Sequence, residues 1–334
     1  MKVRDVFDAI WPVTRRQFKR VTTDATEKTI QMEKEINRLI NLTNEILSYM
    51  NEEQKRQAEN HELIIKILDK NQTDFRENHK EIKNEIEKIS ENVQTQNKIN
   101  NQIINMLRMN KRFNEENVWA NVFHDATNQT EWMKKSNFTP GRWAIGYQTL
   151  YVLYRVLNEI QPQSILELGL GESTKMITQY VDTHKEVIHK VVEHDENWIK
   201  IFKDRTVLSE RTDIIVKKLS TDGTMNGIND IRIYDDFSEV IMPATYDLIV
   251  IDAPWGGDMK EYARIDIAGI MPGCLKKSFV ILVDDYNRIG EQKMVGYMKK
   301  LLEDNGVEYA MAKYEGAKDL AVITSKDLGF VCTL

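Results

Sequence analysis

The stretch Ser164-Ile-Leu-Glu-Leu-Gly-Leu-Gly-Glu-Ser-Thr-Lys175 decides the fold expected for the second half of this chain. It begins with a short apolar run that carries one carboxylate, Glu167, and it turns through Gly169 and Gly171 into a helix-like segment. A buried strand that breaks into a glycine turn and a helix N-terminus forms a nucleotide cradle, because glycine lets a ligand approach the backbone. The same pattern also fits a plain strand-to-helix turn of an α/β domain, so the neighbouring segments must decide.

Length, charge and cysteine content limit the class of protein. A chain of 334 residues has room for one or two domains, and its formal net charge of −6 gives no bulk attraction to nucleic acid. Two cysteines are too few for a disulfide framework and fit a reducing compartment. No apolar run reaches the roughly 18 residues of a membrane span, and the N-terminus lacks a secretory signal. We therefore expect a cytoplasmic protein with no nucleic-acid partner.

Glycine and proline are distributed unevenly along the chain. All 15 glycines lie at Gly141 or later, and neither residue type occurs between Pro12 and Pro140. This stretch without helix breakers is far longer than a typical globular helix of about 10–14 residues. We predict one very long helix there, or a few helices with little turn chemistry between them.

A heptad seam, with positions spaced alternately by three and four residues, runs from Ile40 to Leu107 and is mostly apolar. Heptads sustained over this length predict a coiled coil, which as one helix would extend about 130 Å over residues 25–110. A single polar helix cannot bury such a seam, so we expect a homo-oligomer formed through residues 25–110. Seam asparagines favour a parallel dimer and seam isoleucines favour trimers or tetramers, so the number of chains stays open.

Two shorter segments flank the coil. Residues 1–22 combine aromatic and apolar side chains with a basic cluster around Arg15 and Arg16, which fits either peripheral attachment to the inner face of the membrane or a small packing segment. Residues 115–160 are rich in aromatic side chains and contain a predicted helix, Trp143 to Leu157, that packs on the domain after it. The domains expected are thus residues 1–22, 23–114, 115–160 and 161–334.

Strand and helix patterns alternate from residue 161 onward. Apolar runs such as Leu248-Ile-Val-Ile251 and Phe279-Val-Ile-Leu-Val283 indicate strands buried on both faces. We predict strands at residues 164–169, 187–193, 213–219, 246–253, 279–285, 307–313 and 320–324, and helices at residues 173–184, 196–205, 258–270 and 291–305. This alternation predicts a doubly wound, mostly parallel sheet, which binds ligands beyond the carboxyl ends of its strands.

Carboxylates stand at those strand ends. Glu193 ends the second strand and is placed to accept both hydroxyls of a ribose, and further carboxylates end the fourth and fifth strands at Asp252 and at Asp284-Asp285. A nicotinamide-dinucleotide enzyme would carry G-x-G-x-x-G, but Thr174 takes the place of the third glycine. The pattern therefore favours a nucleoside cofactor other than a dinucleotide.

Four segments within residues 160–325 together resemble the motifs of class I S-adenosylmethionine-dependent methyltransferases. Leu166-Glu-Leu-Gly-Leu-Gly-Glu-Ser-Thr174 is similar to their "E-x-G-x-G-x-S-T" motif, and Val192-Glu-His-Asp-Glu-Asn-Trp198 to "V-E-H-D-x-x-W". Ile251-Asp-Ala-Pro254 resembles "I-D-G-P" with Ala for Gly, and Val283-Asp-Asp-Tyr-Asn-Arg288 resembles "V-D-D-x-x-R". This combination resembles methyltransferases that modify sugars or polysaccharides.

The resemblance implies a Rossmann-like sheet of seven strands with an antiparallel last pair, preceded here by the long coiled coil. It also implies S-adenosylmethionine as the cofactor and a role for individual residues. Asp252 would lie near the methyl donor and Glu193 would hold the ribose. The cofactor-binding residues implied by the resemblance are Glu167, Gly169, Gly171, Ser173, Glu193, Asp195, Asp222 and Asp252.

The carboxylates at the fourth and fifth strand ends have two interpretations. Some family members bind a divalent metal there, and Asp252, Asp284 and Asp285 are oxygen ligands of the kind that suits Mg²⁺. Alternatively, Asp284 or Asp285 caps the following helix or pairs with an arginine. Asp252 and Asp284 are the candidate catalytic residues. Candidate substrate contacts, suited to an acidic or sugar ligand, are Trp255, Tyr262, Arg264 and Arg288.

Three functions fit these observations. The first is an oligomeric methyltransferase that acts on a glycan or lipid-linked saccharide, with the coil holding the catalytic domains at a distance from a membrane or partner enzyme. The second is a scaffold or regulatory subunit that binds the cofactor without turnover, since Ala253 replaces the usual glycine and no convincing catalytic histidine is present. The third is a small-molecule or protein methyltransferase whose coil serves only assembly.

Overall fold

The computed structural model describes residues 31–62, 75–141 and 143–334. The chain divides into two compact units, residues 1–103 and 104–334, and helix α2 (Phe75–Thr127) contributes to both. Residues 1–22, with their predicted membrane contact, lie outside the described residues. Within the described part of the chain, no helix is both long enough and apolar enough to cross a membrane.

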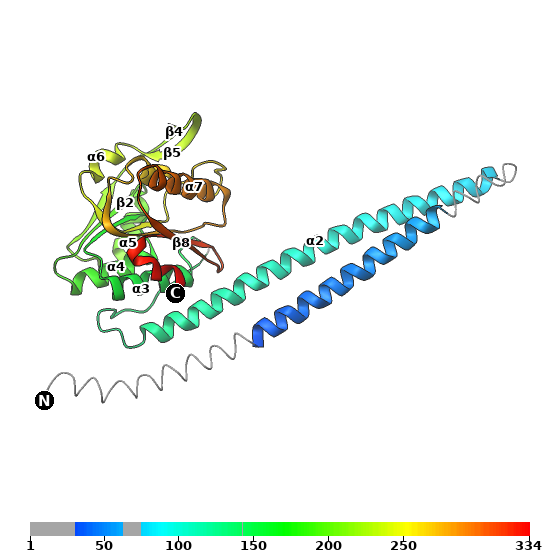
Figure 1. The fold of residues 1–334 in the computed structure, drawn as a ribbon, viewed down its shortest axis with the longest axis horizontal. Coiled ribbons are helices and arrows are strands. Elements are labelled where there is room, and N and C mark those ends of the chain that lie inside the picture. Colours follow the sequence, from blue (N-terminus) through cyan, green and yellow to red (C-terminus); the bar gives the residue numbers. More distant parts are fainter. Residues whose placement is uncertain (1–30, 63–74, 142) are drawn as a thin grey trace. The chain divides into compact units, whose positions relative to one another are not determined.

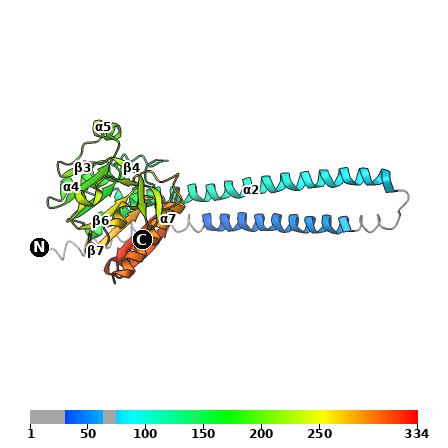
Figure 2. The same ribbon diagram turned by 90° about the horizontal axis from the view of Figure 1, so that it is seen from above.

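The first unit contains two antiparallel helices. Residues 31–62 are helical and run beside the first part of α2 in both views (Figures 1 and 2), and Asn100 Nδ2 lies 3.5 Å from Met50 Sδ. Part of the predicted seam is thus covered within one chain, and a single straight helix over residues 25–110 is wrong. Other apolar seam residues remain exposed, among them Ile40 at 49% and Ile103 at 40%.

The second unit is built on a seven-stranded sheet. The strands are β1 (Ser164–Leu168), β2 (Ile188–Glu193), β3 (Thr212–Val216), β6 (Tyr246–Ile251), β7 (Leu275–Val283), β8 (Tyr309–Tyr314) and β9 (Leu320–Ser325). Their order is β3-β2-β1-β6-β7-β9-β8, with β9 antiparallel to both of its neighbours and the other pairs parallel. This topology confirms the predicted Rossmann-like, doubly wound fold with an antiparallel last pair.

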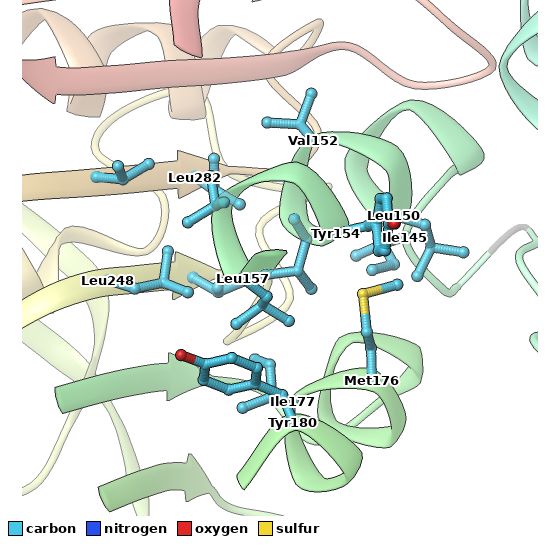
Figure 3. Close-up of a cluster of buried hydrophobic side chains, with 14 of the residues drawn as sticks. Ile145, Leu150, Val152, Tyr154, Leu157, Met176, Ile177, Tyr180, Leu248 and Leu282 are labelled. Atoms are coloured by element: carbon cyan, nitrogen blue, oxygen red, sulfur yellow. The ribbon is translucent and has the colours of Figure 1, made fainter. Parts of the chain in front are cut away.

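Helices pack on both faces of this sheet. One face is covered by α3 (Tyr147–Arg155), its π-helical continuation η1 (Val156–Ile160), α4 (Glu172–Thr183) and the C-terminal 3₁₀ segment η3 (Lys326–Thr333). Figure 3 shows the core of this face, where Leu157 and Tyr180 of the helices lie over Leu248 and Leu282 of the sheet. The opposite face packs against α7 (Ile289–Asp304), α6 (Phe237–Ile241) and η2 (Ile265–Gly269). The remaining helix, α5 (Glu196–Arg205), follows β2.

Two parts of the second unit differ from the sequence prediction. The strand predicted at 213–219 ends at Val216, and a separate antiparallel hairpin follows, made of β4 (Leu219–Met225) and β5 (Ile228–Tyr234). Its turn, Asn226-Gly227, has φ of 52° and 77°, the left-handed pair that two-residue hairpin turns require. The helix predicted at 258–270 is wrong, because Tyr262 and Arg264 have positive φ and only the short η2 forms there.

Candidate active site

The two glycines of the turn after β1, residues 169–171, have different surroundings. Gly169 has a φ of +102°, and a Cβ atom on it would lie 2.8 Å from the Cβ of Ala253 after β6. Only glycine fits there, because a side chain would strain the backbone and collide with the neighbouring strand end. Gly171 is extended, and no heavy atom of the described chain lies within 4 Å of a Cβ built on it. The turn is therefore packed on one side and open on the other.

A buried polar group supports this turn from below. Thr174 Oγ1 donates a 2.8 Å hydrogen bond to Glu167 Oε2 and accepts a 2.9 Å bond from the backbone N–H of Gly171. His189 Nε2 lies 3.1 Å from the same Glu167 oxygen. Glu167 has no exposed surface, so this structure places it beneath the turn rather than at its open side. Sequence reasoning did not single out Thr174 for this role, although its spacing from Gly171 is that of a capping box.

Glu193 lies at the end of β2 beside the turn. Its Oε2 accepts a 3.1 Å hydrogen bond from the N–H of Leu170, and its Oε1 accepts bonds from the N–H groups of His194 and Asp195. The imidazole of His194 lies 2.8 Å from Oε1. Burial opposes ionisation, but the His194 contact and these N–H donors outweigh it and lower the pKa of Glu193. A buried carboxylate with a lowered pKa is thus held against the glycine turn.

The segment after β2 also fixes the turn. Asp195 Oδ1 accepts hydrogen bonds from the N–H groups of Asn197 and Trp198, so Asp195 is the N-cap of α5. The indole N–H of Trp198 donates a 2.7 Å bond to the carbonyl of Leu170. The tryptophan of the V-E-H-D-x-x-W pattern therefore ties α5 to the glycine turn, a contact that the sequence analysis did not anticipate.

Two other predicted cofactor residues lie in different settings. Ser173 is buried in the first turn of α4. Asp222 is exposed in β4, where it accepts a hydrogen bond from Ser220.

Three carboxylates converge beyond the ends of β6 and β7, as the sequence predicts. One oxygen each from Asp252, Asp284 and Asp285 lies within 4.8 Å of the others, and we call these residues the carboxylate cluster. Asp284 and Asp285 are buried, whereas the Asp252 side chain is 19% exposed to solvent. Burial, followed by the nearby Asp284 carboxylate, raises the pKa of Asp252 well above its ordinary value.

Three cations of the chain are paired with the cluster. The Arg264 guanidinium, only 2% exposed, lies 2.8 Å from Asp285 Oδ2 and 3.3 Å from Asp252 Oδ1. Lys318 Nζ lies 3.1 Å from Asp284 Oδ2 and 3.6 Å from Asp285 Oδ1. Arg288 also lies 2.8 Å from Asp285 Oδ2. The pairing with arginine was one of the two alternatives that the sequence left open, and Lys318 was missed.

The cluster, as it stands, does not fit a magnesium ion. Asp284 Oδ1 accepts a 3.1 Å hydrogen bond from Thr149, so together with the ion pairs only Oδ2 of Asp252 lacks such a contact within the described residues. Magnesium requires near-octahedral oxygen coordination at about 2.0–2.1 Å. An ion bound to these carboxylates would displace Lys318 or Arg264 or lie against their positive charge. We therefore assign no step to a metal.

The predicted substrate contacts separate into exposed and buried groups. Trp255 is 47% exposed, its ring centroid lies 6.4 Å from that of Trp143, and the Arg232 guanidinium stacks on it at 5.7 Å. Tyr262 lines a separate hollow of about 480 Å³ with residues of α7. Arg264 is buried in the ion-pair network, where it cannot contact a substrate directly, and Arg288 is partly buried in the same network.

Comparisons with known proteins bear on the fold. No protein-family model matches this sequence, and no curated protein sequence matches it. A methyltransferase from Podospora anserina bound to SAH is 18% identical, with 63% of this chain and 88% of that chain covered and a TM-score of 0.37. TomG, an O-methyltransferase from Streptomyces achromogenes bound to SAM, is 13% identical, with coverage of 61% and 86% and a TM-score of 0.37. The SAH-bound O-methyltransferase from Bacillus cereus is 15% identical, with coverage of 64% and 91% and a TM-score of 0.37. These similarities concern the fold alone.

Proposed function

We propose that this chain is an S-adenosylmethionine-dependent O-methyltransferase that acts on a saccharide-containing acceptor. The observation that carries the proposal is the position of Glu193, a charged carboxylate held beside the open glycine turn of residues 169–171. Glu193 would accept the two ribose hydroxyls, and the space above Gly171 would receive the amino-acid part of the cofactor. Asp252, on the neighbouring strand end, would face the methyl group.

The chemistry asks little of such a site. The acceptor oxygen attacks the methyl carbon in line with the carbon–sulfur bond, that bond breaks, and its electron pair stays on sulfur as the thioether of S-adenosylhomocysteine. Catalysis therefore depends on alignment and on removal of the hydroxyl proton. Asp252 is partly exposed and has a raised pKa, so it suits a proton acceptor that works nearer to neutral pH.

The exposed aromatic pair Trp143 and Trp255 supports a saccharide acceptor. Trp143 is 74% exposed, so two large rings face solvent side by side near the carboxyl end of β6. Arg232 and Asp258 form a bidentate ion pair next to Trp255, with N–O distances of 3.1 and 2.9 Å. Aromatic faces bordered by polar groups suit a ring that is apolar on one face and carries hydroxyls at its edge.

The coil supports assembly into a homo-oligomer. Leu39, Leu42, Ile46 and Tyr49 recur at helical spacing on the first helix, and all four are exposed although the helix pairs with α2. Exposed apolar positions at intervals of three and four residues are the contact positions of helical bundles. Size-exclusion chromatography with light scattering, comparing the chain with a Leu42→Lys, Ile46→Lys variant, tests this assembly. A monomeric wild type would refute it.

Membrane attachment through residues 1–22 has its own test. Flotation with liposomes should bring the full-length chain to the top of a gradient, while a chain that starts at residue 22 should stay at the bottom. Equal behaviour of the two chains would refute membrane attachment through residues 1–22.

Calorimetry with S-adenosylmethionine tests the proposed cofactor. We expect wild-type binding, at least a ten-fold loss in Glu193→Gln, and a similar loss in Gly171→Ala, because the added methyl group occupies the open side of the turn. Gly296→Ala is the control, since nothing in the described chain lies within 4 Å of its Cβ and it belongs to α7. Unchanged affinity for S-adenosylmethionine in both Glu193→Gln and Gly171→Ala would contradict binding of the cofactor at this turn.

Turnover separates the enzyme from a non-catalytic scaffold. Labelled S-adenosylmethionine should transfer its methyl group to extracted cell-surface glycans, and Asp252→Asn should reduce the rate at least 100-fold while it still binds the cofactor. Cofactor binding without transfer to glycans, small molecules or proteins would favour the scaffold. Transfer to small molecules or proteins alone would identify a different acceptor class.

A further inference from the structure

We propose that Lys318 is a built-in cation that takes the position of a divalent metal at the carboxylate cluster, so that methyl transfer by this chain is metal-independent. The inference rests on the proposed function for its catalytic consequence, but the cation-binding property can be measured separately. It goes beyond the ion pairs foreseen from the sequence, because those involved only arginines close to the cluster in the chain.

Lys318 reaches the carboxylate cluster from the loop between β8 and β9. Its Nζ is 3.1 Å from Asp284 Oδ2 and 3.6 Å from Asp285 Oδ1, so a single ammonium group bridges two carboxylates. Arg264 bridges Asp285 and Asp252 from the other side, at 2.8 and 3.3 Å. Together the two side chains link all three carboxylates, which is the task that a metal ion performs in a metal-dependent site.

The backbone that carries Lys318 is fixed by the core of the domain. Buried Gln148 of α3 donates a hydrogen bond of 2.5 Å to the carbonyl of Lys318. The next residue, Asp319, donates its N–H to Asn287 Oδ1 at 3.2 Å and accepts a 2.8 Å bond from the N–H of Tyr286. Lys318 thus belongs to the loop between β8 and β9, and hydrogen bonds hold the backbone of this loop at Lys318 and at Asp319.

The C-terminal part of α2 holds the same loop from outside. The indole of Trp119 donates a 2.7 Å bond to the carbonyl of Glu315, and Glu116 Oε2 accepts a 3.0 Å bond from the N–H of Ala317. Arg112 lies 3.2 Å from Asp319 Oδ1. With contacts from α2, from α3 and from the segment after β7, the loop cannot move Lys318 out of the cluster without breaking several hydrogen bonds.

Electrostatics favours the lysine over an added ion. The Lys318 side chain is only 12% exposed, and its ammonium group has the carboxylates of Asp284 and Asp285 as direct partners. A divalent ion bound to the same oxygens would have to displace this ammonium group or lie against its positive charge, and it would have to be dehydrated as well. The remaining contact-free oxygen, Oδ2 of Asp252, is then available to the acceptor hydroxyl.

Titration with Mn²⁺, followed by electron paramagnetic resonance of the full chain, tests the inference directly. Wild type should bind no Mn²⁺ at micromolar to low millimolar concentration. Lys318→Met, and Lys318→Gln as a second replacement, should bind one ion at least ten-fold more tightly than wild type, because the uncompensated carboxylates become ligands. Lys318→Arg should behave as wild type, and Lys293→Met, which removes an exposed lysine paired with Glu261, is the matched control.

Each outcome decides the question. Binding of Mn²⁺ by wild type that Asp284→Asn abolishes would overturn the proposal, and so would the absence of binding in both folded lysine replacements. Methyl transfer by wild type should be unchanged in EDTA, whereas a rate that EDTA removes and Mg²⁺ restores would also overturn it. Failure of the proposed function itself would appear as loss of S-adenosylmethionine binding, which calorimetry reports without any metal.

Discussion

Thr174 Oγ1 donates a 2.8 Å hydrogen bond to Glu167 Oε2, and both side chains are fully buried. This bond connects the first turn of α4 to the middle of β1, and through the N–H of Gly171 it sets the shape of the glycine turn. The residue that replaces the third glycine of the dinucleotide pattern therefore has a structural purpose of its own. It stabilises the turn from its buried side.

Replacing Thr174 by valine should loosen the glycine turn. The variant keeps the shape of the side chain but leaves the N–H of Gly171 without its partner and leaves Glu167 Oε2 with His189 alone, which costs about 1–3 kcal/mol. We expect a loss of this size in the free energy of unfolding and about ten-fold weaker binding of S-adenosylmethionine in calorimetry. Thr183→Val is the control, because Thr183 Oγ1 bonds only carbonyls of its own helix and the adjacent His184. Equal effects in the two variants would contradict a special role for Thr174.

Gly169→Ala should destabilise the fold more than an alanine at another left-handed glycine. At Gly169 the substitution adds a collision with Ala253 to the strain of a positive φ. At Gly306, with a φ of +68°, only the strain arises because no described heavy atom lies within 4 Å. Urea unfolding should show about 1 kcal/mol lost at Gly306 and about 3 kcal/mol at Gly169. Matching losses would mean that β6 can move away from the turn.

Asp266 should make stability fall as pH rises. Burial raises its pKa to about 7 from an ordinary value of 3.8, although the N–H of Tyr234 donates a 2.7 Å bond to it. Between these two pH values the folded chain keeps a proton that the unfolded chain releases, so stability decreases with rising pH and levels off above about pH 7. Thermal unfolding of wild type and Asp266→Asn from pH 5 to 8 checks this. The two melting curves should approach each other at pH 5, and parallel pH profiles would exclude Asp266 as the source.

Asp195 can be tested separately as a helix cap and as a cofactor contact. Asp195→Asn keeps the capping oxygen and should retain stability within about 0.5 kcal/mol, whereas Asp195→Ala should lose about 1 kcal/mol. We expect the stable asparagine variant to bind S-adenosylmethionine several-fold more weakly, because the resemblance to methyltransferases implies a cofactor contact for this carboxylate. Wild-type affinity in that variant would leave Asp195 with the capping role alone.

The sheet could be predicted from sequence because its signals are local. Apolar runs such as 279–283 indicate buried parallel strands, and the helix predicted at 196–205 has the observed limits of α5, which Asp195 caps. The meeting of Asp252 with Asp284 and Asp285 was also predictable. The carboxyl ends of neighbouring parallel strands share one edge of a sheet, so strand-ending carboxylates come together there.

The remaining features depend on contacts between distant parts of the chain. The helix expected at 258–270 gives way to irregular backbone because Arg264 turns inward to reach Asp285, 21 residues later in the chain. The antiparallel pairing of residues 31–62 with α2 could not be foreseen, since heptads show an apolar face but not the partner that covers it. The β4–β5 hairpin was missed even though Asn226-Gly227 is a strong local turn signal.

The antiparallel direction of β9 has a consequence for the order in which this site is made. Val283 of β7 pairs with Ala321 of β9, so the loop before β9 reaches the edge of the sheet where the parallel strands end. During synthesis all three carboxylates leave the ribosome before Lys318 does. A growing chain that has reached β7 therefore carries neighbouring acidic groups with only part of their counter-charge, and the repulsion among them is relieved when the last hairpin, β8 and β9, joins the sheet. The β8–β9 hairpin thus brings in Lys318, the cation that completes the charge balance of the site.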